Sequence, residues 1–297
     1  MSGLVYRHQR VQRLRRLLGR RSARKEEGRF VIEGLNLLEE ALSAGVALES
    51  VYVDGDWSAS QPVLAAGERD EGEAEAEAED APGRQQRLRE LLQRCYDTGA
   101  RVFELDRGVL ARVAGTVSPQ PVMAVVEVPA VSMRDIGDRR PGMFVVCVDV
   151  RDPGNAGTVV RSAWAAGADA VVCAEGTVDM WNPKAVRSSA GAVLHMPVVP
   201  AGPAAEALAE VGSWGLRRFG AVCTGGDDYA MADFTAPCGF VVGNEAAGLP
   251  LAEIRGELDG LVSIPMPGGA ESLNVGMATA VLCFEAARQR RTKGAER

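Results

Sequence analysis

The sequence predicts an α/β protein of two domains, and three observations support this. At 297 residues the chain is long enough for two hydrophobic cores. From residue 143 onward, strongly apolar segments of strand length alternate with helical patterns, as in MFVVCVDV, DAVVCAE and GFVVGNE. A looser alternation of the same kind occupies the first 130 residues. Continuous apolar strands separated by helices are typical of a parallel sheet covered on both faces, so we expect a doubly wound C-terminal domain.

The N-terminal domain is expected to span residues 1–130 and to begin with an amphipathic basic helix. Arginines are dense between Arg7 and Arg29, and apolar residues recur at helical spacing among them, at Val11, Leu14, Leu17 and Leu18. The arginines could form a solvated helix face or contact phosphates, and their density favours phosphate contact. A short strand in RFVIEG, a helix over about 35–44 and a strand over 49–54 then predict the start of a βαβ unit.

An acidic low-complexity segment interrupts this domain. Residues 68–80, ERDEGEAEAEAED, lack the apolar content needed to fold, so about 56–84 are expected to form a disordered-like surface insertion. This segment contributes many of the carboxylates that make the net charge -7. The negative net charge therefore argues only weakly against a nucleic-acid partner. Helix and strand patterns resume after Arg84, a last strand is expected at 122–129, and residues 131–140 are expected to be a linker.

The C-terminal domain, residues 141–297, places three polar loops directly after strands, where doubly wound sheets bind ligands. In the first, DVRDPGNAG, Asn155 is well placed as an N-cap, and the helix behind it suits an anion such as a phosphate. Arg161 follows about 240° around that helix, so the two residues need not share a face. Its rigid fork of donors suits phosphate or carboxylate, although a surface ion pair would also explain it.

The second and third loops follow later strands. In GNEAAGLP, Gly243 allows the backbone to approach a ligand closely, and Glu245 could cap the following helix or hold a basic partner. In IPMPGGAESLN, prolines and glycines fix an irregular loop whose backbone donors could hold an adenine or a carboxylate. Ser272 or Asn274 is expected to cap the long final helix. The apolar stripe of that helix indicates core or a dimer interface, and it comprises Val275, Ala278, Val281 and Leu282.

Together the three loops resemble the SpoU (TrmH) family of RNA 2′-O-ribose methyltransferases, part of the SPOUT class. They are similar to the family motifs D-x-x-D-P-x-N-x-G-x-x-x-R, GNEGxGLP and I-P-M-x-G-x-x-E-S-L-N-V-S, and NPKAVRSSAGAV resembles an intervening segment. The likeness is strong over 141–291 and looser over RFVIEGLNLLEEAL. Gly276 stands where the family has serine or alanine, and Trp164 with Ala166 departs from its usual Ala-Ala-Phe.

This resemblance implies a C-terminal SPOUT domain with a trefoil knot, a smaller N-terminal α/β RNA-binding domain, and a homodimer whose active sites draw on both chains. It implies methylation of a ribose 2′-hydroxyl in structured RNA, with S-adenosyl-L-methionine as the methyl donor and 23S ribosomal RNA as the preferred substrate. The implied catalytic residues are Arg161, Asn155, Glu245, Ser272 and Asn274. The implied donor-binding residues are Gly243, Ile264, Leu273 and Thr224. The resemblance implies that Arg161 contacts the target phosphate and hydroxyl. Its guanidinium has a very high pKa, which makes a general-base role costly, so we expect a phosphate clamp.

Other functions stay open on the residues alone. Transfer RNA is an alternative substrate, and a non-catalytic RNA-binding or ribosome-assembly protein is disfavoured because Arg161 and Asn274 are both present. Missing GxGxxG and phosphate-loop patterns argue against another nucleotide-binding enzyme. No apolar run reaches the roughly 18 residues of a membrane span, and no apolar signal core follows the start, so a cytoplasmic protein without a membrane partner is expected. Six cysteines without a CxxC pair indicate structural thiols rather than a metal site.

Overall fold

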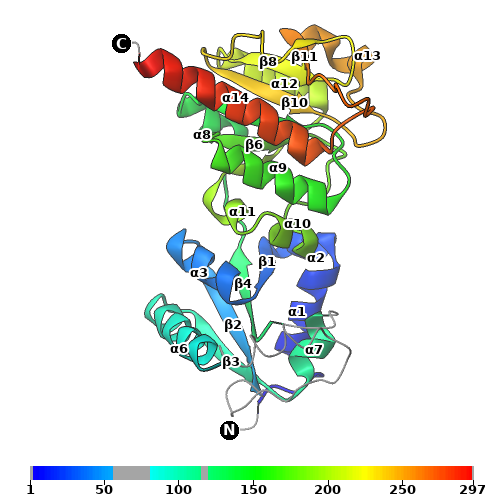
Figure 1. The fold of residues 1–297 in the computed structure, drawn as a ribbon. Helices are drawn as coiled ribbons and strands as arrows, with labels where there is room; N and C mark the ends of the chain where they lie inside the picture. The colour runs from blue at the N-terminus through cyan, green and yellow to red at the C-terminus, as the bar shows by residue number, and fades with distance from the viewer. Residues whose placement is uncertain (1–2, 56–80, 115–119, 296–297) are drawn as a thin grey trace. The chain divides into compact units, whose positions relative to one another are not determined.

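The structure is a computed structural model that describes residues 3–55, 81–114 and 120–295 (Figure 1). It divides into two compact units, Met1–Val128 and Pro129–Arg297. Residues 56–80, which make up most of the expected acidic insertion, lie outside the described residues. Residues 81–84, expected to close that insertion, belong instead to helix α6 (Ala81–Asp97).

The first unit is built on a four-stranded mixed sheet in the order β1-β4-β2-β3. Its strands are β1 (Arg29–Glu33), β4 (Val122–Glu127), β2 (Leu48–Asp54) and β3 (Arg101–Leu105). The expected βαβ start is present, because β1 and β2 both run antiparallel to β4 and therefore parallel to each other, but β4 lies between them. Helices α3 (Leu35–Ser43) and α6 lie on one side of the sheet, and α1 (Gln9–Gly19) and α7 (Val109–Ala114) on the other (Figure 1).

The expected single basic helix is two helices, α1 and α2 (Arg21–Glu27). Arg20 adopts an extended conformation between them, directly after Gly19, a residue that helices disfavour. Val11, Leu14 and Leu17 are fully buried in the core of the first unit, so the apolar stripe of α1 packs on the sheet as its spacing predicts.

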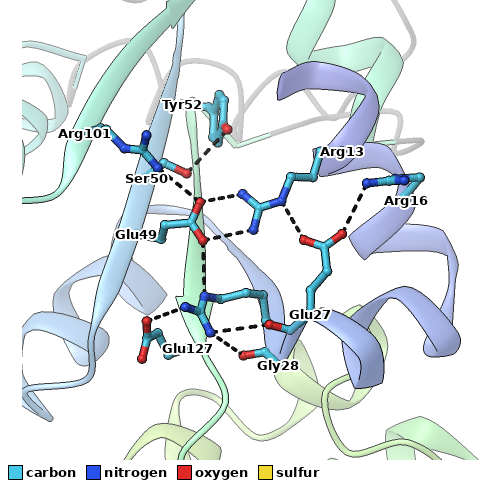
Figure 2. A network of polar contacts seen from close by, with 10 residues as sticks. Arg13, Arg16, Glu27, Gly28, Glu49, Ser50, Tyr52, Arg101 and Glu127 are labelled. Atoms are coloured by element: carbon cyan, nitrogen blue, oxygen red, sulfur yellow. Dashed lines mark hydrogen bonds and ion pairs between the residues drawn. The ribbon is translucent and has the colours of Figure 1, made fainter. Parts of the chain in front are cut away.

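Several arginines of this basic segment form hydrogen bonds and ion pairs with other residues of the first unit (Figure 2). Glu49 on β2 accepts hydrogen bonds from Arg13, Arg29 and Arg101, with a distance of 2.9 Å from Arg13 Nη2 to Oε2. Glu27 pairs with Arg13 and with Arg16. Arg24 is buried and donates to the backbone oxygen of Leu17 at 2.6 Å. These arginines join α1 and α2 to the sheet, and they are less available to phosphates than the sequence suggests.

The second unit is built on a parallel sheet in the order β7-β6-β5-β10-β8-β11-β9. Its strands are β5 (Met143–Cys147), β6 (Ala170–Cys173), β7 (Val198–Pro200), β8 (Arg217–Ala221), β9 (Asp227–Asp228), β10 (Cys238–Val242) and β11 (Gly260–Ser263). β5 and β10 are buried along their whole length, because helices cover both faces of the sheet. This confirms the doubly wound α/β expectation.

Helices of the second unit divide between those two faces. On one face, α12 (Ala204–Ser213) and α13 (Leu251–Ile254) pack with Phe144 and Val146 of β5 in one apolar core. The opposite face of the sheet is covered by α9 (Pro153–Ala165) and α14 (Val275–Ala295), which pack against each other (Figure 1). The remaining short helices are α10 (Pro183–Ser188), α11 (Ala192–His195) and the 3-10 turn η1 (Arg255–Glu257).

The expected linker at 131–140 contains helix α8 (Met133–Asp138). A capping box begins this helix: Ser132 Oγ accepts from the Asp135 backbone N–H at 3.2 Å, and the Asp135 carboxylate accepts from the Ser132 backbone N–H at 2.8 Å. Met133 and Ile136 are buried in the core of the second unit. The segment is therefore part of that unit, and the Ser-x-x-Asp spacing was its local signal.

Within the described residues, no helix combines the length and the apolar character of a membrane span. All six cysteines are free, five of them buried and Cys223 exposed. Burial raises the pKa of the Cys95 thiol to about 11 and that of Cys283 to about 12, so both stay protonated near neutral pH.

Close packing of α14 on α9 explains the glycine at position 276. A Cβ atom there would lie 2.5 Å from Thr158 Cγ2 and 2.8 Å from Thr158 Cβ. Gly276 thus lets the first turn of α14 approach α9 more closely than an alanine or serine would allow.

We expect Gly276→Ala to destabilise the second unit by about 1–3 kcal/mol, the usual cost of overpacking a close contact. Urea unfolding measures the change, and Gly256→Ala is the matched control, since a Cβ at position 256 would meet nothing within 4 Å. Thr158→Ser removes Cγ2 but keeps Cβ and the hydroxyl that donates to the Gly154 oxygen at 2.9 Å, so it should restore part of the stability that Gly276→Ala loses. Equal stability of Gly276→Ala and wild type would contradict the close contact.

Candidate functional site

Four neighbouring strands of the second unit end at one edge of the sheet. In the order β5-β10-β8-β11 all pairs are parallel, so their carboxyl ends point the same way. The loops that follow these strands carry Asp149, Gly243, Thr224 and Ile264. The structure therefore brings the three predicted loops, and the Thr224 loop, to the edge where doubly wound sheets bind ligands.

Hydrogen bonds between Asp149 and Asn244 join the first loop to the second. Asp149 has a left-handed backbone with φ 56°, a conformation that a non-glycine residue adopts at a cost. Asn244 Nδ2 donates to the Asp149 backbone oxygen at 3.0 Å and to its Oδ2 at 3.2 Å, and Arg151 Nε donates to its Oδ1 at 2.9 Å. Sequence reasoning did not assign these residues to the site, although both stand in the loops it selected.

The helix of the first loop begins three residues before the expected position. Asp152, not Asn155, is the N-cap: its Oδ1 accepts from the Asn155 backbone N–H at 2.9 Å, and Pro153 occupies the first turn, where its fixed φ is favourable. The prediction that Asn155 caps the helix was therefore wrong. Lys184 Nζ lies 2.8 Å from Asp152 Oδ2, and this hydrogen bond, with that from Asn155 N–H, lowers the pKa of Asp152.

Because Asp152 caps the helix, the Asn155 side chain can make other hydrogen bonds, and these join the second loop to the third. Its Nδ2 donates to Glu245 Oε1 at 3.0 Å, and its Oδ1 accepts from Asn274 Nδ2 at 2.7 Å. Asn274 Oδ1 in turn accepts from the Gly276 backbone N–H at 2.9 Å, which makes Asn274, rather than Ser272, the cap of α14. A continuous hydrogen-bonded chain, Glu245–Asn155–Asn274, thus connects all three loops.

Glu245 acts on the first loop rather than on the helix that follows it. Its carboxylate accepts from the backbone N–H groups of Arg151 at 3.2 Å and Asp152 at 3.0 Å, just ahead of α9. Burial alone would raise the pKa of Glu245, but the hydrogen bonds from Asn155 and from these backbone groups lower it below its ordinary value. The ionised carboxylate is therefore the form that holds the loops near neutral pH.

Arg161 and Ser272 lie outside this hydrogen-bonded chain. Both are exposed, and neither makes a hydrogen bond or ion pair within the part of the chain that the structure describes. Six residues along α9 separate Arg161 from Asn155 by about 9 Å along the axis and about 240° around it. One turn further, Trp164 is 43% exposed and stacks on His195 with 4.8 Å between ring centroids.

The predicted donor-binding residues lie on the loops at the sheet edge. Thr224 is exposed after β8, Ile264 is half-buried after β11, and Leu273 is exposed ahead of α14. A Cβ at Gly243 would lie 2.5 Å from the Gly248 carbonyl, so the turn itself requires this glycine. From Ile264 to Leu273 the only backbone hydrogen bond within the described loop joins Gly269 N–H to the Met266 oxygen, which leaves its other backbone groups available to a ligand.

Comparison with protein families matches both units. Residues 142–284 match the SpoU rRNA Methylase family, and residues 8–124 match the MRM3-like substrate binding domain. A 23S rRNA guanosine 2′-O-methyltransferase of Bacillus subtilis is 30% identical over 88% of this chain and 89% of its own. A 23S rRNA uridine 2′-O-methyltransferase of Streptomyces viridochromogenes is 31% identical over 97% of this chain and 92% of its own.

Solved structures show the same architecture. The SpoU methyltransferase AviRb from Streptomyces viridochromogenes, in complex with AdoMet, superposes with a TM-score of 0.78 at 30% identity, over 96% of this chain and 99% of that one. An AdoMet-bound rRNA methyltransferase from Sinorhizobium meliloti gives a TM-score of 0.79 at 26% identity, over 97% of each chain. With three joined loops at the expected edge and relatives that match nearly end to end, the chain belongs to the SpoU rRNA methylase family.

Proposed function

We propose that this protein transfers the methyl group of S-adenosylmethionine to a ribose 2′-hydroxyl of 23S ribosomal RNA. The Glu245–Asn155–Asn274 chain carries the proposal, because it builds one site from the three loops that distinguish the family. Two relatives of almost full length are named as 23S rRNA 2′-O-methyltransferases, one for guanosine and one for uridine. Since these relatives share the ribose reaction and differ in the base, the proposal specifies the ribose and the RNA.

The residues at the sheet edge fit the methyl donor. Unpaired backbone groups between Ile264 and Leu273 can bind its adenosyl part by hydrogen bonds, and Gly243 and Thr224 begin the neighbouring loops. The bound donor supplies an electrophilic methyl group on a positively charged sulfur. Asp149 and Asn244 hold the first two loops in fixed positions, which favours a single orientation of the bound reactants.

Arg161 is proposed to hold the RNA for the reaction. Its planar fork suits a phosphate oxygen beside the target ribose, and a donor to the 2′-oxygen lowers the pKa of that hydroxyl. The guanidinium stays protonated, so it serves as a clamp and not as a base. Asn155, Glu245 and Asn274 fix the loops around the reacting atoms, and the exposed Ser272 hydroxyl is proposed to contact the ribose.

A second copy of the chain is proposed to complete the site. Arg161 lies about 240° around α9 from the chain's own Asn155, so the two residues are on different faces of that helix. Exposed apolar side chains lie on the two packed helices α9 and α14, or just before α14: Trp164, Leu273, Met277 and Phe284. Aromatic residues and methionine are enriched at protein interfaces relative to the rest of the surface. We infer a homodimer in which Arg161 of each copy serves the site of the other.

A mixture of two inactive variants tests this arrangement. When Arg161→Ala and Asn274→Ala copies are refolded together, half of the dimers are mixed, and each mixed dimer has one intact site if Arg161 acts across the interface. About a quarter of wild-type activity should return, as expected for a two-fold symmetric dimer. No recovery, with mixed dimers present by mass spectrometry, would contradict a shared site.

Methyl transfer itself is tested with labelled S-adenosylmethionine and purified RNAs. We expect label in 23S rRNA that lacks its natural modifications, and alkaline hydrolysis should show protection of one phosphodiester bond, as a 2′-O-methyl group produces. Label in transfer RNA alone would favour the alternative substrate, and absence of label in any RNA would favour a non-catalytic RNA-binding protein. The trefoil knot and the cytoplasmic location stay predictions.

A further inference from the structure

A surface pocket in the first unit has no assigned role. Its volume is about 420 Å³, and it is bounded by the start of the chain, the segment after β3 and helix α7. Three arginines line it, Arg7, Arg107 and Arg112, together with a single carboxylate, Asp106. With three cations and one anion the lining is net positive, so the pocket favours an anionic ligand.

An aromatic ring lies among these charges. Tyr6 lines the pocket, and the guanidinium carbon of Arg112 lies 3.9 Å from the centre of its ring. Arg15 of α1 also lies over the Tyr6 ring, at 4.8 Å. Stacked guanidinium and phenol groups offer flat surfaces of the kind on which RNA bases stack.

The guanidinium N–H groups of Arg7 and Arg112 make no hydrogen bonds within the described residues, so they can donate to a ligand. Both side chains are exposed, and neither makes an ion pair within that part of the chain. They differ in this from Arg13, Arg16 and Arg24 of the basic segment, which donate to carboxylates or backbone oxygens. The volume falls within the range of about 300 to 1,000 Å³ that is typical of small-ligand sites, enough for a single nucleotide.

We propose that this pocket, the Tyr6 pocket, binds one nucleotide of the RNA substrate outside the methyl-transfer site. Arg7 and Arg112 contact the phosphate, and the base stacks on the Tyr6–Arg112 pair. The inference rests on the proposed function for the identity of the RNA. The match to a substrate binding domain over residues 8–124 includes Arg107 and Arg112 but identifies no contact with RNA. The Tyr6 pocket is the part of this domain that is proposed to contact the RNA.

The test compares two variants with the same change in charge. Arg7→Gln/Arg112→Gln removes two donors from the pocket, and Arg89→Gln/Arg94→Gln removes two exposed arginines of α6 in the same unit. Binding of a 23S rRNA fragment to the full-length protein is measured over a range of salt concentrations, after circular dichroism and thermal unfolding show that both variants fold. The pocket variant should bind about tenfold to a hundredfold more weakly, and its salt slope should fall by about 0.7 to 0.9, the change expected for one lost phosphate contact.

Further measurements distinguish an RNA nucleotide from a free nucleotide as the ligand of the pocket. They also distinguish a failure of the pocket inference from a failure of the proposed function. Arg112→Lys keeps the charge but loses the flat stacking surface, and it should retain the salt slope while weakening binding. If both double variants bind RNA alike, the pocket inference is overturned although the wild type still methylates 23S rRNA. If uridine monophosphate binds the wild type but not the pocket variant, and RNA binding is unchanged, the pocket takes a free nucleotide and the RNA assignment is wrong. Absence of methyl transfer to 23S rRNA by the wild-type protein would contradict the proposed function and not the pocket inference.

Discussion

Arg161→Ala should reduce methyl transfer to 23S rRNA by at least about a hundredfold, while S-adenosylmethionine still binds with nearly unchanged affinity. Donors aimed at charge that develops in a transition state are commonly worth two to three orders of magnitude in rate. Because Arg161 is exposed and makes no polar contact within the described residues, its removal should not disturb the fold. Single-turnover transfer of labelled methyl groups measures the rate, and calorimetric titration measures donor affinity.

Two further variants make this result specific. Arg94→Ala removes an equally exposed arginine of the first unit and should change neither quantity by more than about twofold, in keeping with surface substitutions. Arg161→Lys retains a cation but loses the planar fork, and it should recover part of the rate. Full activity of Arg161→Ala would show that the arginine neither holds the RNA nor acidifies the hydroxyl.

Glu49→Gln should destabilise the first unit by about 1.5–3 kcal/mol, the range for hydrogen bonds to charged groups. Glu49 accepts from Arg13, Arg29 and Arg101, and its side chain is only 19% exposed, so the three guanidiniums lose a partly buried anion together (Figure 2). Hydrogen exchange should accelerate in β1 to β4 and stay unchanged in β5 and β10. Glu26→Gln, an exposed carboxylate of α2, is the control and should leave both units as they are.

The same carboxylate predicts how stability depends on pH. The hydrogen bond from Arg13 lowers the pKa of Glu49 in the folded chain, against the opposing effect of burial. A lowered folded-state pKa stabilises the protein fully above the unfolded value of about 4.5, and the contribution is lost as the pH falls through the folded pKa. Unfolding between pH 6 and 3 should therefore show a smaller acid slope for Glu49→Gln than for the wild type. Equal slopes would mean that Glu49 has the same pKa in both states.

Local sequence signals located most elements but not every boundary. The Asp-Pro pair could have placed the start of α9 at Pro153, since aspartate is a favoured N-cap and proline a favoured first residue. Likewise the Ser132-x-x-Asp135 spacing is a helix start within a segment expected to be a linker. In the first segment, Asn155 is a competing candidate for the cap, and it was preferred to Asp152. In the second, the proline and arginine content is typical of a linker, so the cap at Ser132 was missed.

Hydrophobic periodicity and turn residues act over a few positions, so they were enough to predict the α/β class and the three loops with their residues. Which of these loops meet depends on contacts between distant parts of the chain. Strands β5, β10, β8 and β11 are neighbours in space although not in the chain, and their order places Glu245 beside Asn155, 90 residues away. The tertiary structure also decided which arginines are held internally, since Glu49 meets Arg13 and Arg101 across 36 and 52 residues. Strand order follows from the packing of whole helices and sheets, and no short window of sequence records it.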